Sequence, residues 1–531
     1  MAAAAAWLMV TALLLGAGGG LVWLLSLVID SSGGKKRRSR QLPLPPGPRP
    51  LPIVGNMHLV GPLPHLDMLE LSKRYGPLMH LQLGSIHTIV VSSPEMAEQF
   101  LKTHDANFAN RINSEAFRQF SYNGKTFSFA DSGPFWRETR RLCFTHLFSQ
   151  QRIAAFRPVR TEELRGVVRS IEEAAEARSA VNVSTALGTL TANMGSRIVL
   201  GKKFQGEGKE VEEFWKNTRE LLTLLGTFNL NDYIPLLKPF DIQGVRKRIK
   251  AVHKVFDEFM ERMIDEHLEK KQQQQHDREE EEEEGSVVDK DFIDIMLGLM
   301  HSNELVDGHP VDRTIVKAIA LDMLEVFMDT LRTPVEWAFS ELLKNPRVMK
   351  KVQAELEAVV GLHRQVEESD IPKLEYLTLC VKESLRLHPQ LAFVIHRGKD
   401  ECAVGGYRIP ANSTVMINIW KIGRDPTVWP NADEFLPERF IDNGVDTRGN
   451  DFRFLSFGSG RRICIGMNLA MVMVPLVLGQ LAHGFDWELT GGVKPSELDM
   501  NVAFGLTMPR AVELVAVPTN RLLPTPPTPT A

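Results

Sequence analysis

The chain has few cysteines for its length. Its 531 residues include four, Cys143, Cys380, Cys402 and Cys464, and no two of them stand in a CxxC spacing. Four scattered thiols are too few for a disulfide framework, and without CxxC pairs nothing indicates a structural zinc site. We therefore expect the main body of the protein to fold in a reducing compartment.

Three other features are missing. The net charge is −4, and no basic stretch interleaved with aromatic residues stands out, so nucleic acid is not expected as a partner. No G-x-G-x-x-G fingerprint follows a predicted strand, so the chain has no dinucleotide site of its own. Internal repeats are also absent. The 43% hydrophobic and 24% charged residues are ordinary for a globular protein with a substantial core.

The N-terminus lacks charge altogether. No charged residue occurs from Ala2 to Ile29, and a helix over Trp7–Ile29 would rise about 35 Å, enough to cross a bilayer core. The basic run KKRR at 35–38 follows, and positive flanks stay cytoplasmic. We predict a single transmembrane anchor at 1–30. A cleaved signal peptide is the alternative, but it favours a basic start and a shorter apolar core.

Composition divides the rest of the chain. After the anchor comes a basic and proline-rich linker at 31–52, whose prolines favour a stiff, extended segment. The main domain is predicted at 53–520, interrupted by an acidic low-complexity loop at 269–285. Residues 521–531 are predicted to be a disordered tail.

Apolar periodicity predicts a mainly α protein with small β-sheets (α+β). The pattern favours a β-hairpin, a long helical region, two further helices, a strand and a late loop; these cover 78–94, 94–310, 312–345, 373–388, 405–420 and 504–509. Asn345-Pro346 should end the third of these segments.

The stretch FGSGRRICIG at 457–466 carries the strongest chemical signal. Cys464 precedes an apolar run that we interpret as a helix beginning at the cysteine. A helix N-terminus lowers a thiol's pKa, and the glycines allow the backbone to approach the sulfur. A thiolate held in this way is a soft ligand for haem iron, and the arginines would pair with haem propionates. For any single cysteine, a buried structural role is the alternative.

The complete pattern F-x-x-G-x-R-x-C-x-G makes that alternative improbable, because a chance match is on the order of one in ten thousand. It is formed by Phe457, Gly460, Arg462, Cys464 and Gly466. At these residues the sequence resembles the cytochrome P-450 family of haem-thiolate monooxygenases, over about 40–520. The resemblance implies the cytochrome P-450 fold behind the membrane anchor, and a heme b whose iron takes the Cys464 thiolate as axial ligand.

Two further motifs fit the resemblance. Glu383 and Arg386 in KESLRLHP stand three apart on one helical face, which alone would be a surface ion pair. With Arg439 in FLPERF they match the family's buried Glu–Arg–Arg network, which implies a structural role. Trp136 and Arg140 in WRETRR match residues that contact haem propionates; an isolated Trp/Arg pair would only mark an amphipathic helix.

Other matches indicate the branch of the family. Arg397 in VIHRG resembles another propionate-binding arginine. PPGP and the anchor point to the microsomal type, and IGRDPTVWPNADEFLPERF and LDMNVAFGLTMPRAVEL look like plant enzymes acting on small specialised metabolites. The resemblance also implies that Asp329 and Thr330 deliver protons for oxygen activation. Outside this helix, an Asp-Thr dipeptide would be a cap or a surface pair.

The sequence departs from the family around that pair. The family pattern is (Ala/Gly)-Gly-x-(Asp/Glu)-Thr-(Thr/Ser), whereas this chain has Val326, Phe327 and Leu331 at its first, second and last positions. A phenyl ring in place of a hydrogen would overpack a tight site. Either Phe327 points away from the haem face, or oxygen activation is impaired. Pro334 predicts a kink in the same helix.

A second departure lies in HPQLAFVIHR. Ala392 and His396 stand where plant relatives often have proline, which affects the conformation of a substrate-facing loop. We expect substrate contacts from five apolar-leaning segments, at 111–131, 222–240, 322–330, 391–396 and 504–508.

Together these features predict a haem monooxygenase in the endoplasmic reticulum membrane, single-pass, with its catalytic domain in the cytosol. It would use O₂ and electrons from an NADPH-dependent flavoprotein reductase to oxidise a small lipophilic metabolite, such as a terpenoid or phenylpropanoid. The alternatives are a haem-thiolate isomerase or dehydratase, a weakly active or non-catalytic haem binder, and a membrane-tethered scaffold.

Overall fold

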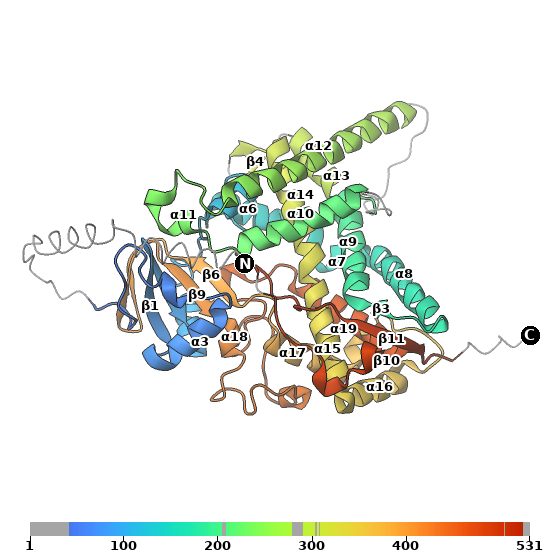
Figure 1. The fold of residues 1–531 in the computed structure, drawn as a ribbon. Helices are drawn as coiled ribbons and strands as arrows, with labels where there is room; N and C mark the ends of the chain where they lie inside the picture. The colour runs from blue at the N-terminus through green and yellow to red at the C-terminus, as the bar shows by residue number, and fades with distance from the viewer. Residues whose placement is uncertain are drawn as a thin grey trace, which may run out of the picture.

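Helices make up most of the described chain, and four small sheets lie at its edges, with β1, β6 and β9 at one end, β3, β10 and β11 at the other and β4 beside α12 (Figure 1). The computed structural model describes residues 42–203, 209–278, 290–302, 305–306, 308–503 and 505–523. The predicted anchor at 1–30 and most of the predicted tail lie outside the described residues, and so does the first part of the linker. The mainly α class predicted from the sequence is confirmed.

The α-helices are α3 (Pro64–Tyr75), α4 (Pro94–Glu98), α5 (Glu115–Phe120), α6 (Pro134–Cys143), α7 (Gln150–Ala155), α8 (Arg157–Glu176), α9 (Val183–Leu200), α10 (Lys209–Gly226), α11 (Leu230–Tyr233), α12 (Val245–Arg278), α13 (Phe292–His301), α14 (Arg313–Thr330), α15 (Arg332–Lys344), α16 (Pro346–Val360), α17 (Glu375–Leu387), α18 (Ile419–Ile422) and α19 (Met467–Gly484). The strands are β1 (Leu78–Leu83), β2 (Ile86–Val91), β3 (Val181–Asn182), β4 (Leu305–Val306), β5 (His309–Pro310), β6 (Phe393–Arg397), β7 (Cys402–Val404), β8 (Tyr407–Ile409), β9 (Thr414–Asn418), β10 (Phe485–Leu489) and β11 (Val515–Asn520).

The largest sheet has four strands in the order β1-β2-β9-β6 and lies beside α3 at one end of the molecule (Figure 1). β1 and β2 form the predicted hairpin, with Leu81 opposite Thr88 and Gly84 in the turn at a φ of 54°. Successive side chains of a strand point to opposite faces. Leu78 therefore packs in one apolar cluster and Met79 in another, so both faces of this sheet are buried.

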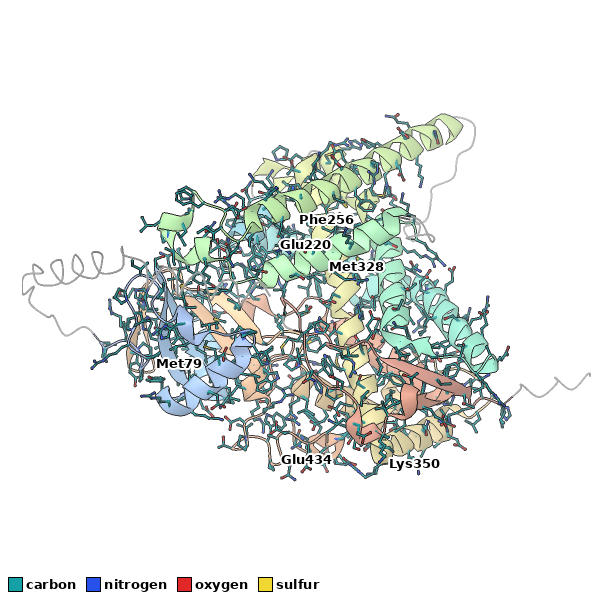
Figure 2. The ribbon with its side chains drawn as sticks, in the orientation of Figure 1. Met79, Glu220, Phe256, Met328, Lys350 and Glu434 are labelled. Atoms are coloured by element: carbon teal, nitrogen blue, oxygen red, sulfur yellow. The ribbon has the colours of Figure 1, made fainter. Side chains whose placement is uncertain are left out.

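The helical part encloses the main core. Phe256 of α12 and Met328 of α14 are buried there, whereas Met79 marks the sheet end (Figure 2). Among the described residues, α19 is long and apolar enough to span a membrane, but 72% of it is buried. It is therefore a core helix, and the predicted N-terminal anchor stays a prediction.

The long helix predicted over 312–345 is two helices. Asp312 caps the first by accepting from the backbone N–H of Ile315 at 2.7 Å. α14 ends at Thr330, Leu331 lies between, and α15 begins at Arg332. Pro334 has no N–H to give to the Thr330 carbonyl four residues earlier, so the helix breaks there. This confirms the predicted kink.

Two boundaries differ from the sequence predictions. α12 continues to Arg278, so residues 269–278 of the predicted acidic loop are helical. Glutamine, lysine and glutamate are good helix formers, although their low-complexity composition suggested a loop. The rest of that loop lies outside the described residues. α19 begins at Met467 rather than at Cys464, because Gly466 occupies the cap position.

Candidate active site

The loop before α19 is shaped by glycine. Gly460 has a φ of 66°, and a Cβ there would lie 2.2 Å from the carbonyl oxygen of Leu101. Only glycine fits such an approach in the left-handed region. The backbone N–H of Cys464 donates to the carbonyl of Phe457 at 3.0 Å and closes the loop. Phe457 and Gly460 thus set the backbone path that presents the cysteine.

Gly466 contributes differently. Its φ is −84°, and a Cβ there would make ordinary contacts, 3.5 Å from Cε1 of Phe148 and 3.9 Å from Sγ of Cys464. The backbone N–H groups of Gly466 and Met467 are directed at the thiol and lower its pKa, and so does the charge of Arg140. Burial outweighs these groups and raises the pKa of Cys464. The lowered thiol pKa predicted from the sequence is therefore wrong for the protein without a bound cofactor.

A cavity of about 410 Å³ opens beside Cys464. Cys464 lies deep in the fold but borders this hollow, so its exposed surface faces the cavity, whereas Cys143 and Cys380 are buried on all sides. A volume of this size suits a drug-sized or cofactor-sized ligand. The cavity is lined by Trp136, Arg137, Arg140, Arg141, Phe144, Ile463, Cys464, Ile465, Met467 and Asn468.

Trp136 and Arg140 face this cavity from α6. The Nε1 atom of Trp136 is buried and has no hydrogen-bond partner. Arg140 donates from Nη2 to the carbonyl of Ile463 at 2.6 Å, and its guanidinium lies 5.9 Å from the Trp136 ring. An unpaired buried donor beside an arginine is the kind of group that an acidic ligand would satisfy.

Arg462 lies behind the cavity rather than on its wall. Its guanidinium is 4.2 Å from the Trp136 ring and donates to the carbonyls of Ala109, Phe127 and Ala130. Burial lowers its pKa, and the charges of Arg111 and Arg140 lower it further. Three arginines gathered in one buried region favour an anionic partner.

Arg397 is placed elsewhere. It donates to the carbonyl of Arg111 at 2.8 Å, to Oδ1 of Asn412 at 3.1 Å and to a carboxylate oxygen of Asp131 at 2.6 Å. It does not line the cavity beside Cys464. Arg111, which we did not single out from the sequence, holds the same loop by donating to the carbonyls of Ser128 and Ile395. No local motif marks Arg111, because its partners come from distant segments.

The predicted Glu–Arg–Arg network is present in the structure. Arg386 donates to both carboxylate oxygens of Glu383 at 2.7 Å, and Arg439 donates to one of them at 2.8 Å. The side chains of Glu383 and Arg386 are fully buried. Ser456, just before the Cys464 loop, donates to the carbonyl of Leu385 at 2.7 Å. The network therefore fixes α17, which in turn holds the loop.

Asp329 and Thr330 occupy the last turn of α14. Oδ2 of Asp329 accepts from Nε2 of Gln390 at 3.4 Å, and burial raises its pKa. The hydroxyl of Thr330 donates to the carbonyl of Val326 at 2.5 Å. Neither residue lines the cavity beside Cys464.

Phe327 points toward α9. Its side chain is 2% exposed and its ring stacks on that of Phe148 at 5.7 Å. A Cβ at Gly195 would lie 2.7 Å from the Cβ of Phe327, so the absence of a side chain on α9 makes room for the ring. Phe327 and Asp329 stand about 200° apart around the helix. The predicted overpacking is thus relieved by Gly195.

The opposite face of α14 carries two acids that the sequence interpretation passed over. Oδ2 of Asp322 accepts from the backbone N–H of Ser128 at 3.0 Å, and burial raises its pKa to about 7. Glu325 lies one turn on, 3.3 Å from the hydroxyl of Thr218. Two acidic residues inside an apolar helical run are a sequence signal of a polar site in the core. This face also meets the segments predicted to contact substrate at 111–131 and 504–508, through Ser128 beside Asp322 and Thr507 beside Asp329.

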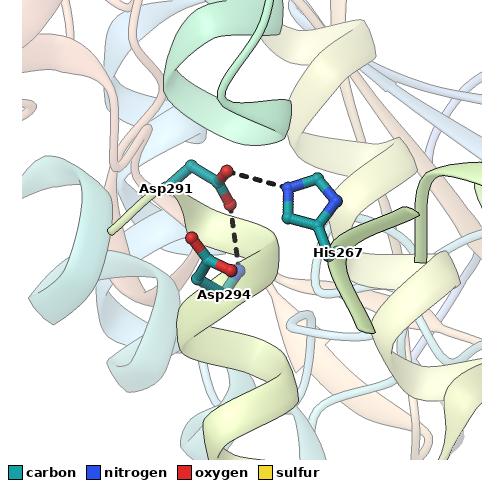
Figure 3. Close-up of side chains that lie close together, drawn as sticks. All are labelled: His267, Asp291 and Asp294. Atoms are coloured by element: carbon teal, nitrogen blue, oxygen red, sulfur yellow. Dashed lines mark hydrogen bonds and ion pairs between the residues drawn. The ribbon is translucent and has the colours of Figure 1, made fainter. Parts of the chain in front are cut away.

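Another ionisable cluster joins α12 to α13 (Figure 3). His267 contacts Oδ2 of Asp291 at 2.9 Å through Nε2 and the carbonyl of Met263 at 2.6 Å through Nδ1. Burial opposes the charged ring, but the bonds to Asp291 and Met263 outweigh it and raise the pKa of His267. Asp291 also caps α13 by accepting from the N–H of Asp294. The ligand atoms of these three residues lie within 4.8 Å of one another, but every contact is explained by an ion pair and a cap.

Comparison with known proteins agrees with this geometry. The protein-family model described as cytochrome P450 matches residues 45–514 of this chain. Cytochrome P450 CYP736A12 of Panax ginseng is 44% identical over 90% of this chain and 94% of its own. A flavonoid 3'-monooxygenase of Petunia hybrida is 39% identical over 92% and 94%, and a 3,9-dihydroxypterocarpan 6A-monooxygenase of Glycine max is 39% identical over 92% and 96%.

A solved zebra fish cytochrome P450, determined with abiraterone, has the same fold. It covers 86% of this chain and all of its own, with a TM-score of 0.68 and 23% identity. Family members are haem-thiolate monooxygenases, and the cavity, the buried arginines and the cysteine suit that cofactor. The chain belongs to the cytochrome P450 family, and like its plant relatives it is a haem-thiolate monooxygenase.

Proposed function

We propose that the protein oxidises a small lipophilic plant metabolite of the phenylpropanoid or terpenoid kind. Two relatives that are 39% identical are named for oxidation of a flavonoid and of a pterocarpan, and both align along more than nine tenths of their length. The observation that carries the proposal is the thiol of Cys464 at the edge of a cavity of about 410 Å³ with Trp136 and Arg140 on its wall.

Cys464, Trp136 and Arg140 are the residues proposed to hold the haem. The unpaired Nε1 of Trp136 and the guanidinium of Arg140 would bind its propionates, and Arg462 would add positive charge from behind. When bound, the haem supplies the oxygen-activating chemistry, which a thiolate ligand favours. Arg397 supports this site indirectly through the loop that contains Arg111 and Asp131.

Asp329 and Thr330 are proposed to hold and pass protons. Burial raises the pKa of Asp329, so this carboxyl retains a proton more readily than a surface aspartate. The Thr330 hydroxyl follows it at the helix end. Because Phe327 packs against Gly195 and Phe148, its ring does not crowd this pair. This geometry supports a working monooxygenase over the isomerase and non-catalytic alternatives.

The protein is proposed to sit on the endoplasmic reticulum membrane, with its catalytic domain in the cytosol. Exposed apolar side chains gather near the start of the described chain: Ile53 is 52% exposed, Leu236 78% and Phe240 64%. Their segments meet at the β1–β2 turn, where the N–H of Gly84 donates to the carbonyl of Val54 at 3.2 Å and the N–H of Ser85 donates to the carbonyl of Tyr233 at 2.8 Å. An apolar end beside the predicted anchor suits a membrane surface.

Electrons are proposed to come from an NADPH-dependent flavoprotein reductase. The test is to express the full chain in microsomes with such a reductase and to supply phenylpropanoids, flavonoids, terpenoids and fatty acids. NADPH-dependent gain of one oxygen atom in a phenylpropanoid, flavonoid or terpenoid is the expected result. Haem-loaded protein that oxidises fatty acids alone would contradict the substrate class, and turnover of no compound would contradict the activity.

A further inference from the structure

Glu325 in the middle of α14 has a carboxylate oxygen without a partner. The residue is 8% exposed, and its Oε2 is buried with no hydrogen-bond partner. Oε1 lies 3.3 Å from the hydroxyl of Thr218 on α10, a long hydrogen bond. Within the described chain, the charged groups that act on Glu325 are two acids, Asp322 and Asp329, and no cation.

The neighbouring acids are satisfied, which sets Glu325 apart. Asp322 accepts from the backbone of Ser128 and is near Arg111. Asp329 has Gln390, Thr507 and Arg332 around it. A buried polar atom without a partner is rare in native proteins and calls for an explanation.

Glu325 lies on the face of α14 that meets the segments proposed to contact substrate. Asp322 and Asp329 stand three residues before and four after it, so the three acids share one face of α14. Phe327, two residues on, packs on α9 about 200° away. The groups that meet the acidic face are Thr218 of α10, Ser128 and Thr507, and the last two belong to the segments at 111–131 and 504–508 that are proposed to contact substrate.

The protonation state of Glu325 indicates which chemical group it can bind. Burial raises the pKa of Glu325 to about 8, and the charges of Asp329 and Asp322 add to this shift. At neutral pH the group is mainly a neutral acid, which donates one hydrogen bond and accepts others. A hydroxyl group has the same capacity, so the two form a matched pair, whereas an apolar group would leave the acid unsatisfied.

We propose that the carboxyl of Glu325 binds a hydroxyl group of the substrate and so selects hydroxylated aromatic compounds over analogues without that hydroxyl. The inference rests on the proposed function and adds that the substrate carries a hydroxyl group bound by Glu325. Sites built to bind a hydroxyl discriminate strongly against its absence, because their own polar groups are then left unpaired.

The test uses the full-length, haem-loaded protein with a trihydroxyflavanone and the three analogues that each lack one of its hydroxyl groups. Dissociation constants are measured from the change in haem absorbance, and kcat and KM with the reductase. We expect one analogue to bind about 10- to 100-fold more weakly than the parent. Glu325→Met should weaken the parent to that analogue's level and leave the analogue unchanged.

Two further variants complete the experiment. Glu325→Gln, whose amide also donates and accepts, should keep most of the discrimination. Glu220→Gln, on the same α10 helix as Thr218 but paired with Arg248 at the surface, is the matched control and should change nothing. Equal weakening of all four compounds by Glu325→Met would overturn the inference and leave the proposed function intact.

Two other outcomes are decisive. Equal affinities of the wild-type protein for all four compounds would overturn the hydroxyl assignment even if Glu325→Met loses its haem. Binding of none of the four by haem-loaded wild type would overturn the inference that hydroxylated aromatic compounds are selected, and would leave the proposed function, which includes terpenoids, intact.

Discussion

At position 327 a phenyl ring occupies the space that Gly195 leaves on α9, and the two residues form a complementary pair. The distance of 2.7 Å between the Phe327 Cβ and a Cβ placed at Gly195 is shorter than real contacts allow. A side chain at position 195 is therefore excluded as long as Phe327 is present. This pairing explains how α14 accommodates a large side chain where the family has a small one.

Replacing Gly195 tests this pairing. Gly195→Ala should lower the free energy of unfolding by about 1–3 kcal/mol, because the new methyl group overlaps Phe327. In a Phe327→Gly background the same change should be neutral or stabilising by up to about 1 kcal/mol, since alanine is the better helix former. Denaturant unfolding of the four proteins measures this cycle. Equal effects of Gly195→Ala in both backgrounds would show that the residues do not interact.

Phe327 also permits a test of oxygen activation. Phe327→Gly should destabilise the protein by about 3–5 kcal/mol through the cavity that it leaves. It should not raise NADPH-dependent oxygen consumption per haem, because the ring faces α9 rather than Asp329. A large gain in consumption, measured with the reductase present, would mean that the ring obstructs oxygen activation in the native protein.

Among the helices, α17 depends on a buried carboxylate. Glu383→Gln should cost about 3–5 kcal/mol, because Arg386 and Arg439 would be left without their shared negative partner. Haem retention should fall as well, since α17 holds the loop before Cys464 through Ser456. Thermal unfolding and haem content per protein measure the two effects.

The matched control is Glu70→Gln on α3, whose partner Lys73 is at the surface. Exposed pairs contribute about 0–1 kcal/mol, so this variant should keep its stability and its haem. Comparable losses in both variants would argue against a special role for the buried network.

The junction of α12 and α13 should respond to pH through His267. Its pKa is raised in the folded state, so the Asp291 ion pair gives its full stabilisation below the unfolded pKa of about 6.5. That stabilisation is lost as the pH rises through the folded pKa. The difference in unfolding free energy between wild type and His267→Gln should therefore shrink from pH 6 to pH 9.

Chemical unfolding at several pH values measures that difference, with the exposed His363→Gln as control. A difference that stays constant or grows with pH would show that His267 is not charged in the folded protein.

For the molecule as a whole, the fold class, the hairpin, the Glu383 network and the cysteine loop could be predicted from local patterns and from family resemblance. The helix break at Leu331 also followed from the position of Pro334. What could not be predicted depends on contacts between distant segments. Gly195 opposite Phe327 and the arginine cluster around Trp136 are of this kind.

Other differences between the sequence predictions and the structure have local physical causes. Composition suggested a loop at 269–278, although its residues favour a helix that continues from α12. The helix dipole suggested a lowered pKa for Cys464, but burial in the folded chain outweighs the two N–H groups directed at it. Asp322 and Glu325 were visible as acids in an apolar run, but their meaning depends on which helix face they occupy.

The central claim is that Cys464 binds the haem iron through its sulfur, and a carbon monoxide difference spectrum tests it most directly. The reduced wild-type protein and Cys402→Ser, whose thiol contacts Asn107 and does not line the cavity, should both give the spectrum of a thiolate-ligated haem. Cys464→Ala should lose that spectrum. The account is contradicted if Cys464→Ala retains haem with an unchanged spectrum, or if the wild type binds haem without a thiolate signature.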